Sequence, residues 1–423
     1  MAVRVVSATW VLTGRPGAAD DRAGGSAPDT PGPGATPDPQ AISDGAVALD
    51  DDHVLAVGPR AEIESRFGRS ERLDAVLLPA LVNAHTHLEL SHLRGRIHGG
   101  EGLAPWIHLL ICARAADPEP GRALDEAILE LQEAGVAAVG EVTNTLAALP
   151  HLARAGIAGR LYHEVFGFSG ARIEAALAAA ADIRARAGAP GPGLAIAPSP
   201  HAVYSTHPRV LADLLRAGPA SIHLAEDPGE RVFCATATGP FASLLRMMGA
   251  VDLRPLGRSA VAVAAPSLGP RSLVVHAVDV DEQDVADLAR SRATVVLCPR
   301  SNLHIGGRLP DLPRLLASGV PLAVGTDSLA SSPSLSPLAE LAALARAFPS
   351  VPPARILPLA WNGPAVGAPA VGRLAPGTAP GIFAVPLACA RPEDPAAWLL
   401  GAFDPERRPF TWIARHCPEL AHA

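Results

Sequence analysis

Hydrophobic and polar positions in the first part of the chain follow the pattern of β-strands. Val3–Leu12 and Ala46–Val57 alternate or run apolar and are rich in β-branched residues. Asp50-Asp51-Asp52 interrupts the second stretch and has the composition of a hairpin turn. Residues 14–40 are instead rich in Pro, Gly, Ala and Asp, which predicts a long flexible insertion. We therefore expect an all-β opening section.

From Leu77 onward the pattern changes, and apolar strands alternate with helices rich in Ala, Leu and Arg. The expected strands span residues 78–84, 136–142, 161–166, 194–197, 220–224, 273–277, 293–298 and 321–325. Strands that alternate with helices at this spacing indicate a parallel sheet. Eight such units predict an α/β fold with a (β/α)8 TIM barrel. A doubly wound open sheet is the alternative on the pattern alone.

After an expected helix over residues 335–347, the chain becomes rich in Pro and Gly and then returns to strand-like character. The strand-like stretches are residues 365–371 and 381–387. We expect them to pack with the N-terminal strands in one small β-sandwich domain built from both chain ends. The predicted organisation is residues 1–76 for the first part of the small domain, 77–350 for the barrel, and 351–423 for the second part and tail.

Composition is that of a globular protein. Hydrophobic residues make up 48% of the 423 positions, which indicates a well-filled core rather than disorder. No apolar run reaches the roughly 18 residues that span a bilayer, so no membrane association is expected. The five cysteines are scattered and none forms a C-x-x-C pair, which favours the reducing cytoplasm over a disulfide framework.

The charged residues exclude some classes of partner and of reaction. The net charge is −7, and the basic residues, all of them Arg, form no cluster, so nucleic acid is not an expected partner. The absence of Lys excludes a Schiff base, a carbamylated-lysine metal bridge and a P-loop.

Candidate metal ligands begin at the end of the first barrel strand. His85 and His87 are two residues apart, so in a strand they point to one face and can converge on a transition metal. On this spacing alone, a metal site and two ordinary strand-end histidines are equally good interpretations. Polar residues that suit metal binding or catalysis follow later strands as well: His201, His223, Glu226, His276, Ser301 and Asp327. The carboxyl ends of barrel strands are where such folds place their active sites.

The motifs that carry these residues resemble a known family as an ordered set. They read PALVNAHTHLELSHLRG, SPHAVYS, IHLAEDPGE, VVHAVDV, LCPRSNLHIGG and VGTDSLASS. The set resembles the amidohydrolase superfamily, and within it the branch of adenine- and guanine-type deaminases and triazine chlorohydrolases. HTHLELS, the following LRG and Trp106 look most similar to aminodeoxyfutalosine deaminases.

The resemblance implies a mononuclear metal site with His85, His87, His223 and Asp327 as ligands. Three histidines and one carboxylate suit one divalent ion, Zn²⁺ first and Fe²⁺ as the alternative. Glu226 is implied to be the proton shuttle, and His276 to orient water or substrate. Asp327 is also implied in catalysis, as the acceptor of the water's proton. A helix-start carboxylate is the other interpretation of Glu226.

The substrate side is less defined. His201 matches a family position that contacts the nucleoside, and the alternative is a loop-capping histidine. Glu89 is interpreted either as a substrate contact or as a partner that orients a ligand histidine. The other expected pocket residues are Arg94, Trp106, Asn144 and Ser301. An Arg near the mouth could pair with a substrate carboxylate, although the sequence does not say which Arg. We expect a structural role for the pair His163-Glu164.

The expected function is a metal-dependent deaminase that converts the 6-amino group of an adenine-type nucleoside to 6-oxo and ammonia. The favoured member is aminodeoxyfutalosine deaminase of menaquinone biosynthesis. Deaminases of S-adenosylhomocysteine, methylthioadenosine or guanine, a triazine-type chlorohydrolase and a cyclic amidase are alternatives on the same site. A non-catalytic scaffold would lack metal ligands, and here the set is complete. The expected partners are a small nucleoside and, at most, a second copy of the chain in a homodimer.

Overall fold

The computed structural model describes residues 3–14, 41–118, 120–167, 170–250, 252–388, 390–402, 404 and 410–416. Apart from Gly14, the insertion expected at residues 14–40 lies outside the described residues. None of the helices within these ranges is long and apolar enough to cross a membrane.

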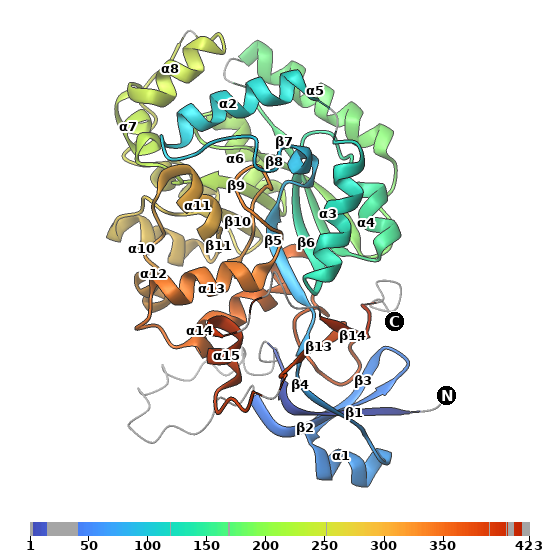
Figure 1. Ribbon diagram of the computed structural model, residues 1–423. Coiled ribbons are helices and arrows are strands. Elements are labelled where there is room, and N and C mark those ends of the chain that lie inside the picture. The colour runs from blue at the N-terminus through green and yellow to red at the C-terminus, as the bar shows by residue number, and fades with distance from the viewer. Residues whose placement is uncertain are drawn as a thin grey trace.

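The centre of the molecule is a barrel of eight parallel strands (Figure 1). They are β5 (Leu81–Thr86), β6 (Val136–Thr143), β7 (Ala158–Val165), β8 (Leu194–Pro200), β9 (Ala220–Leu224), β10 (Ser272–His276), β11 (Thr294–Leu297) and β12 (Leu322–Val324). Hydrogen bonds join neighbouring strands in chain order from β5 through β8 and, separately, from β9 through β12. Parallel bridges close both seams, between Ala202 and His223 and between Thr86 and Asp327. The predicted TIM barrel is confirmed.

Helices surround the barrel strands, as Figure 1 shows. They are α2 (Leu103–Ala116), α3 (Arg122–Glu133), α4 (Leu149–Ala155), α5 (Gly170–Ala187), α6 (Pro208–Ala217), α7 (Pro228–Thr236), α8 (Gly239–Met247), α9 (Ala260–Ala264), α10 (Glu282–Ser291), α11 (Pro299–Gly306), α12 (Leu312–Ser318) and α13 (Pro337–Ala347). Every residue of β6, β9, β10 and β11 is buried, which is why these strands read as continuous apolar runs rather than alternating ones.

Strands from both ends of the chain form a second, six-stranded sheet below the barrel in Figure 1. They are β1 (Arg4–Leu12), β2 (Ala41–Asp50), β3 (His53–Pro59), β4 (Glu71–Pro79), β13 (Ile382–Pro386) and β14 (Thr411–Ala414). The order is β14-β13-β4-β1-β2-β3. Where the sequence suggested a sandwich, hydrogen bonding joins all six strands into one sheet. The structure also contains the helices α1 (Arg60–Phe67), α14 (Pro353–Ile356) and α15 (Pro395–Gly401).

Two predicted strands differ in the structure. The run at residues 78–84 is divided, because Leu78 pairs with Phe383 in the six-stranded sheet and Leu81 begins β5. Burial on both sides of Ala80 conceals this break in the apolar pattern. Residues 365–371 form no strand: a short 3-10 helix, Gly363–Val366, occupies its start. The stretch is apolar because it packs into the same buried cluster as barrel residues such as Val82.

Candidate active site

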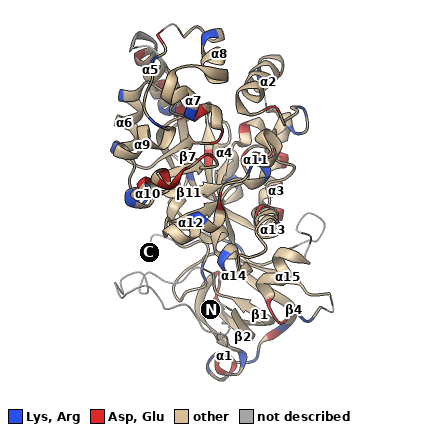
Figure 2. Ribbon diagram, turned by 90° about the vertical axis from the view of Figure 1, so that its left-hand side faces the viewer, with Lys and Arg blue, Asp and Glu red and all other residues tan. Residues whose placement is uncertain are grey.

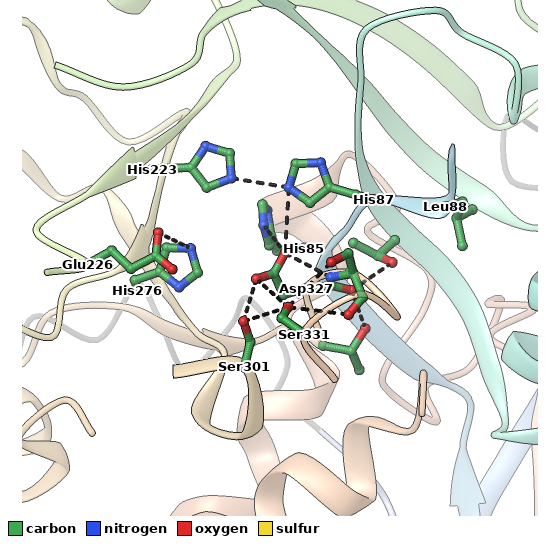
Figure 3. Close-up of polar contacts among 12 residues, drawn as sticks. His85, His87, Leu88, His223, Glu226, His276, Ser301, Asp327 and Ser331 are labelled. Carbon is green, nitrogen blue, oxygen red and sulfur yellow. Dashed lines mark hydrogen bonds and ion pairs between the residues drawn. The ribbon is translucent and has the colours of Figure 1, made fainter. Parts of the chain in front are cut away.

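Four predicted ligands converge at the carboxyl end of the barrel (Figure 3). The Nε2 atoms of His85 and His87 each lie 3.6 Å from Oδ1 of Asp327. The Nε2 atoms of His87 and His223 are 3.2 Å apart. Both ring nitrogens of His85 are buried, and neither has a hydrogen-bond partner among the described residues. The unpaired nitrogens of His85 and the convergence of the four side chains fit one divalent cation, and three imidazoles with one carboxylate match the ligand set that Zn²⁺ prefers.

Tautomer and charge agree with this assignment. The Nδ1 atom of His223 lies 3.1 Å from the carbonyl oxygen of His201, which can only accept, so Nδ1–H donates and Nε2 is left free. Burial lowers the pKa of His223 to about 4. Burial and the neighbouring His85 imidazole hold the pKa of His87 well below its usual range. Both rings are therefore neutral and able to bind a metal near pH 7.

The seam between β5 and β12 places Asp327. The backbone N–H groups of Thr326 and Asp327 both donate to the carbonyl oxygen of His85 at 3.0 Å. Gly325 allows this approach, since a Cβ there would lie 2.6 Å from the Cβ of His85. The backbone of Asp327 has a φ of +59°, which residues other than glycine rarely adopt. This conformation turns its carboxylate toward the histidines. Burial opposes its ionisation, but the imidazoles of His85 and His87 outweigh that effect and hold its pKa well below the usual range.

Glu226 and His276 form a second pair beside these ligands (Figure 3). Oε2 of Glu226, in the turn after β9, is 3.3 Å from Nε2 of His276 at the end of β10. The amide nitrogen of Asn302 lies 3.0 Å from Nδ1 of His276 and donates to it, so the proton of the ring is on Nε2 and faces Glu226. Burial, followed by the charge of Asp327, raises the pKa of Glu226 well above its usual range. This shift favours the protonated form of the carboxyl group, as proton transfer to a substrate requires.

A cavity of about 350 Å³ opens over both groups. This volume suits a drug-sized or nucleoside-sized ligand. His87, His223, Glu226, His276 and Asp327 contribute to its lining. Apolar residues of α2 and α8 line it as well: Leu103, Trp106, Ile107, Leu110, Ile111, Leu244 and Leu245. The cavity therefore combines a polar, titratable part with apolar walls.

Comparisons with known proteins agree with this geometry. Residues 76–404 match the amidohydrolase family. The chain belongs to the amidohydrolase family. It is accordingly a hydrolase that acts on carbon–nitrogen bonds other than peptide bonds.

Three similar proteins have informative names. The chain is 29% identical to a 5-methylthioadenosine/S-adenosylhomocysteine deaminase of Nitratidesulfovibrio vulgaris, over 79% of this chain and 78% of that protein. It is 30% identical to an aminodeoxyfutalosine deaminase of Deinococcus radiodurans, over 76% and 81% of the two chains. The crystal structure of a zinc-bound adenosine deaminase from Xanthomonas campestris is similar in fold, with a TM-score of 0.72 and 22% identity over 99% of this chain and 94% of that one.

Four predicted substrate-side residues of this amidohydrolase line the cavity: His201, Glu89, Trp106 and Asn144. His201 is also bonded within its own loop, with Nδ1 2.5 Å from Oγ of Ser205. Glu89 accepts hydrogen bonds at both oxygens from the turn after β6, including Oγ1 of Thr143 at 2.9 Å and the backbone N–H of Asn144 at 3.0 Å. Glu89 therefore holds that turn and pairs with Arg114 at 3.3 Å, and among the described residues it makes no hydrogen bond to a predicted ligand histidine.

Two predicted substrate contacts are not among the residues that line the cavity. Arg94 donates instead to the carbonyl oxygen of Pro333 and pairs with Glu130 on α3. Ser301 donates to Oδ2 of Asp327 at 2.5 Å, so it lies against a predicted metal ligand and not in the cavity lining. The cation that does line the cavity is Arg114 on α2. The 3-10 helix at Leu88–Leu93 turns the chain between His87 and Arg94, and spacing in the sequence could not show where Arg94 would point.

Glu230 supports the turn of Glu226, although no expectation from the sequence included it. Its carboxylate accepts the backbone N–H groups of Ala225, Glu226 and Asp227, at 3.2, 2.7 and 3.3 Å. Asp227 and Glu230 also form the capping box of α7. Glu226 is thus not the capping residue. The spacing Asp-x-x-Glu at the start of a helix is the signal that could have identified this pair.

An ion-pair network fixes α7 beside the barrel. Arg231 on α7 pairs with Asp279, Asp281 and Asp284 around the start of α10, at distances of 2.7, 3.1 and 2.7 Å. In Figure 2, α7 and α10 both carry acidic and basic segments. Because α7 begins two residues after Glu226, the network stabilises the turn that carries Glu226.

Proposed function

We propose that this amidohydrolase deaminates an adenine-type nucleoside, replacing the 6-amino group by an oxo group and releasing ammonia. One observation carries the proposal. A buried carboxyl group, Glu226, lies against His276 beside a convergent set of three histidines and one aspartate, in a cavity of nucleoside size. The names of the two curated relatives support the same substrate class.

The residues of the set have distinct roles in this proposal. His85, His87, His223 and Asp327 hold one divalent cation, with Zn²⁺ favoured over Fe²⁺ by the ligand chemistry and by the zinc-bound adenosine deaminase of similar fold. When bound, such an ion supplies a water molecule whose pKa falls to about 7. Asp327 accepts a proton at its carboxylate, and Ser301 and Ser331 keep one of its oxygens in place.

Glu226 moves the proton that is transferred to the purine ring. Its carboxyl donates to the ring nitrogen adjacent to the reacting carbon, and this removes the negative charge that addition of hydroxide would leave on the purine. The Nε2–H group of His276 points toward Glu226 and orients the reacting oxygen. A proton then passes to the departing amine, so water and the aminopurine give the oxopurine and ammonia with all atoms conserved.

The test is ammonia release from a panel of adenine nucleosides by the wild-type protein and by Glu226→Gln. The amide keeps the size of the carboxyl but cannot shuttle a proton, so we expect unchanged metal content and a loss in kcat of about 10² to 10⁴. Glu282→Gln on the exposed start of α10 is the matched control and should retain full activity. Ammonia from no nucleoside, or wild-type kcat in Glu226→Gln, would contradict the proposal.

Among adenine nucleosides we place aminodeoxyfutalosine first, in a menaquinone route. The supporting observations are the aminodeoxyfutalosine deaminase that is 30% identical to this chain and Arg114, a cation on α2 that lines the cavity next to apolar side chains such as Ile111. Nη1 and Nη2 of Arg114 bond Asn144 and Glu89, at 3.0 and 3.3 Å, so a substrate carboxylate would share this guanidinium with Glu89. We expect kcat/KM for aminodeoxyfutalosine to exceed that for 5-methylthioadenosine by about tenfold or more. The reverse order would assign the chain to the methylthioadenosine class.

A further inference from the structure

Glu164 is a buried carboxyl group at the end of β7 that the proposed reaction does not use. Its side chain lines the cavity, and the residue is only 7% exposed. Oε2 accepts a hydrogen bond from the Asn144 amide at 2.9 Å. Oε1 is buried and has no hydrogen-bond partner among the described residues. Buried polar atoms are nearly always paired, so an oxygen left free in a binding cavity points to a ligand.

The free oxygen has no task in orienting the metal ligands. It lies 3.5 Å from Nδ1 of His223. That nitrogen, however, already donates to the carbonyl oxygen of His201 at 3.1 Å. The backbone therefore sets the ring of His223, and Oε1 of Glu164 remains available to the substrate.

A short chain of hydrogen bonds determines which oxygen of Glu164 is free. Arg114 donates from Nη1 to Oδ1 of Asn144 at 3.0 Å. Because this oxygen accepts from a guanidinium, the amide NH₂ of Asn144 must face Glu164, where it occupies Oε2. Arg114 and Asn144 thus hold the carboxyl with its other oxygen unpaired.

The place of Glu164 in the barrel separates it from the proton-transfer groups. Glu226 follows β9 and His276 ends β10, whereas Glu164 lies at the end of β7 and Asn144 follows β6, on the other side of β8. A nucleoside whose purine ring has its reacting edge at Glu226 extends away from the proton-transfer groups, Glu226 and His276. The part of a nucleoside that is distant from the reacting carbon and rich in hydroxyl groups is the sugar.

We propose that Glu164 recognises the sugar of the nucleoside by hydrogen bonding its 2′- and 3′-hydroxyl groups through Oε1. This inference rests on the proposed function and adds a specificity-determining residue to it. A site built to bind a hydroxyl discriminates strongly against an analogue that lacks it. The wild-type protein should therefore prefer ribonucleosides over 2′,3′-dideoxynucleosides, and that preference should depend on Glu164.

The experiment combines a deletion in the substrate with a deletion in the protein. Ammonia release is measured with 5-methylthioadenosine and its 2′,3′-dideoxy analogue. We expect wild-type kcat/KM to fall at least about tenfold on the dideoxy analogue, mainly through KM. Glu164→Met has similar length but no hydrogen-bonding group, so it should lose this preference. Glu164→Gln keeps a hydrogen-bonding group and should restore part of it. Glu174→Gln, on the exposed face of α5, is the matched control and should behave as wild type.

Metal content and thermal unfolding accompany each variant. A wild-type protein that deaminates both analogues equally would overturn the role of Glu164, and this comparison holds even if Glu164→Met fails to fold. Full hydroxyl preference in Glu164→Met would also overturn it. Loss of metal from the variant would assign Glu164 to the support of His223 instead. Absence of ammonia from every nucleoside would contradict the proposed function itself, and the sugar assignment with it.

Discussion

Asp327 shows how a single residue depends on neighbours both inside and outside its own motif. Ser301, from the motif after β11, donates to Oδ2 at 2.5 Å, and Ser331 donates to the same oxygen at 3.2 Å. The backbone N–H of Ser328 donates to Oδ1 at 2.8 Å. These bonds fix the direction of the carboxylate, which both metal binding and proton transfer require.

Ser301→Ala tests whether this serine orients Asp327 or contacts substrate. Loss of the hydroxyl removes the shorter of the two bonds to Oδ2, so we predict that kcat falls about tenfold or more while KM changes little. Steady-state kinetics with metal analysis measure both effects. Ser318→Ala, on the outer helix α12, is a suitable control. A rise in KM at constant kcat would instead support the substrate contact predicted from the sequence.

At the scale of single residues, the sequence could predict those site residues whose position follows from the barrel fold. His85, His87, His223, His276 and Asp327 end or follow buried strands, so the barrel alone brings them together. Arg94 and Arg114 could not be distinguished, because their directions depend on the turn and helix after β5. Glu164 follows its strand in the same way, but no motif accompanies it, and its unpaired oxygen is visible only in three dimensions.

At the scale of elements, the start of α7 controls the position of Glu226. Ala225 has φ of +54°, so the turn after β9 adopts a conformation that needs external support. Glu230 supplies that support through three backbone hydrogen bonds. Asp227 also accepts the backbone N–H of Leu103 at 3.0 Å and so connects this turn to α2. The turn, the helix and one wall of the cavity therefore form one unit.

Glu230→Ala should affect catalysis through Glu226 without contact to the substrate. We predict a loss of about 1 kcal/mol or more in the free energy of unfolding, since the capping box and the turn both lose their acceptor. We also predict a lower kcat at nearly constant KM, with normal metal content. Chemical denaturation and kinetics measure these effects, and Glu282→Ala at the start of α10 is the control. Unchanged kcat in a destabilised Glu230→Ala protein would limit Glu230 to a structural role.

The β5–β12 seam offers a second test at this scale. Gly325 lies where any Cβ would be 2.6 Å from the Cβ of His85, in a region of backbone contact that cannot easily move. We predict that Gly325→Ala separates the two strands, displaces His85 from Asp327 and lowers metal affinity at least about tenfold. Gly306→Ala in α11 is the matched control, since nothing lies within 4 Å of a Cβ there and its backbone is helical. Wild-type metal affinity in Gly325→Ala would show that the seam can adjust.

Periodicity predicted the elements better than their connections. The alternation of buried strands and amphipathic helices gave the barrel, because each unit must bury one face. The division at Ala80 and the 3-10 segment near residue 366 were not predictable, since buried residues are apolar whichever sheet or cluster they join. Only pairing partners far apart in sequence, such as Leu78 with Phe383, distinguish these cases.

On the scale of the whole molecule, the proposed metal connects distant parts of the barrel. Its ligands come from β5, β9 and the turn after β12, and thus from both four-stranded halves. An ion that binds only the folded chain should raise the stability of the entire barrel by mass action. The six-stranded sheet contributes none of these ligands and serves to join the two ends of the chain.

The most direct test of the account is removal and return of the metal. A chelator-treated protein is assayed for ammonia release from adenine nucleosides and for thermal unfolding, before and after addition of one equivalent of Zn²⁺. We predict that the metal-free protein releases no ammonia and unfolds at a lower Tm, and that Zn²⁺ restores both properties. His85→Ala should fail to recover, because its imidazole is one of the four ligands. Ammonia release that persists without metal, or none after Zn²⁺ is restored, would contradict the account.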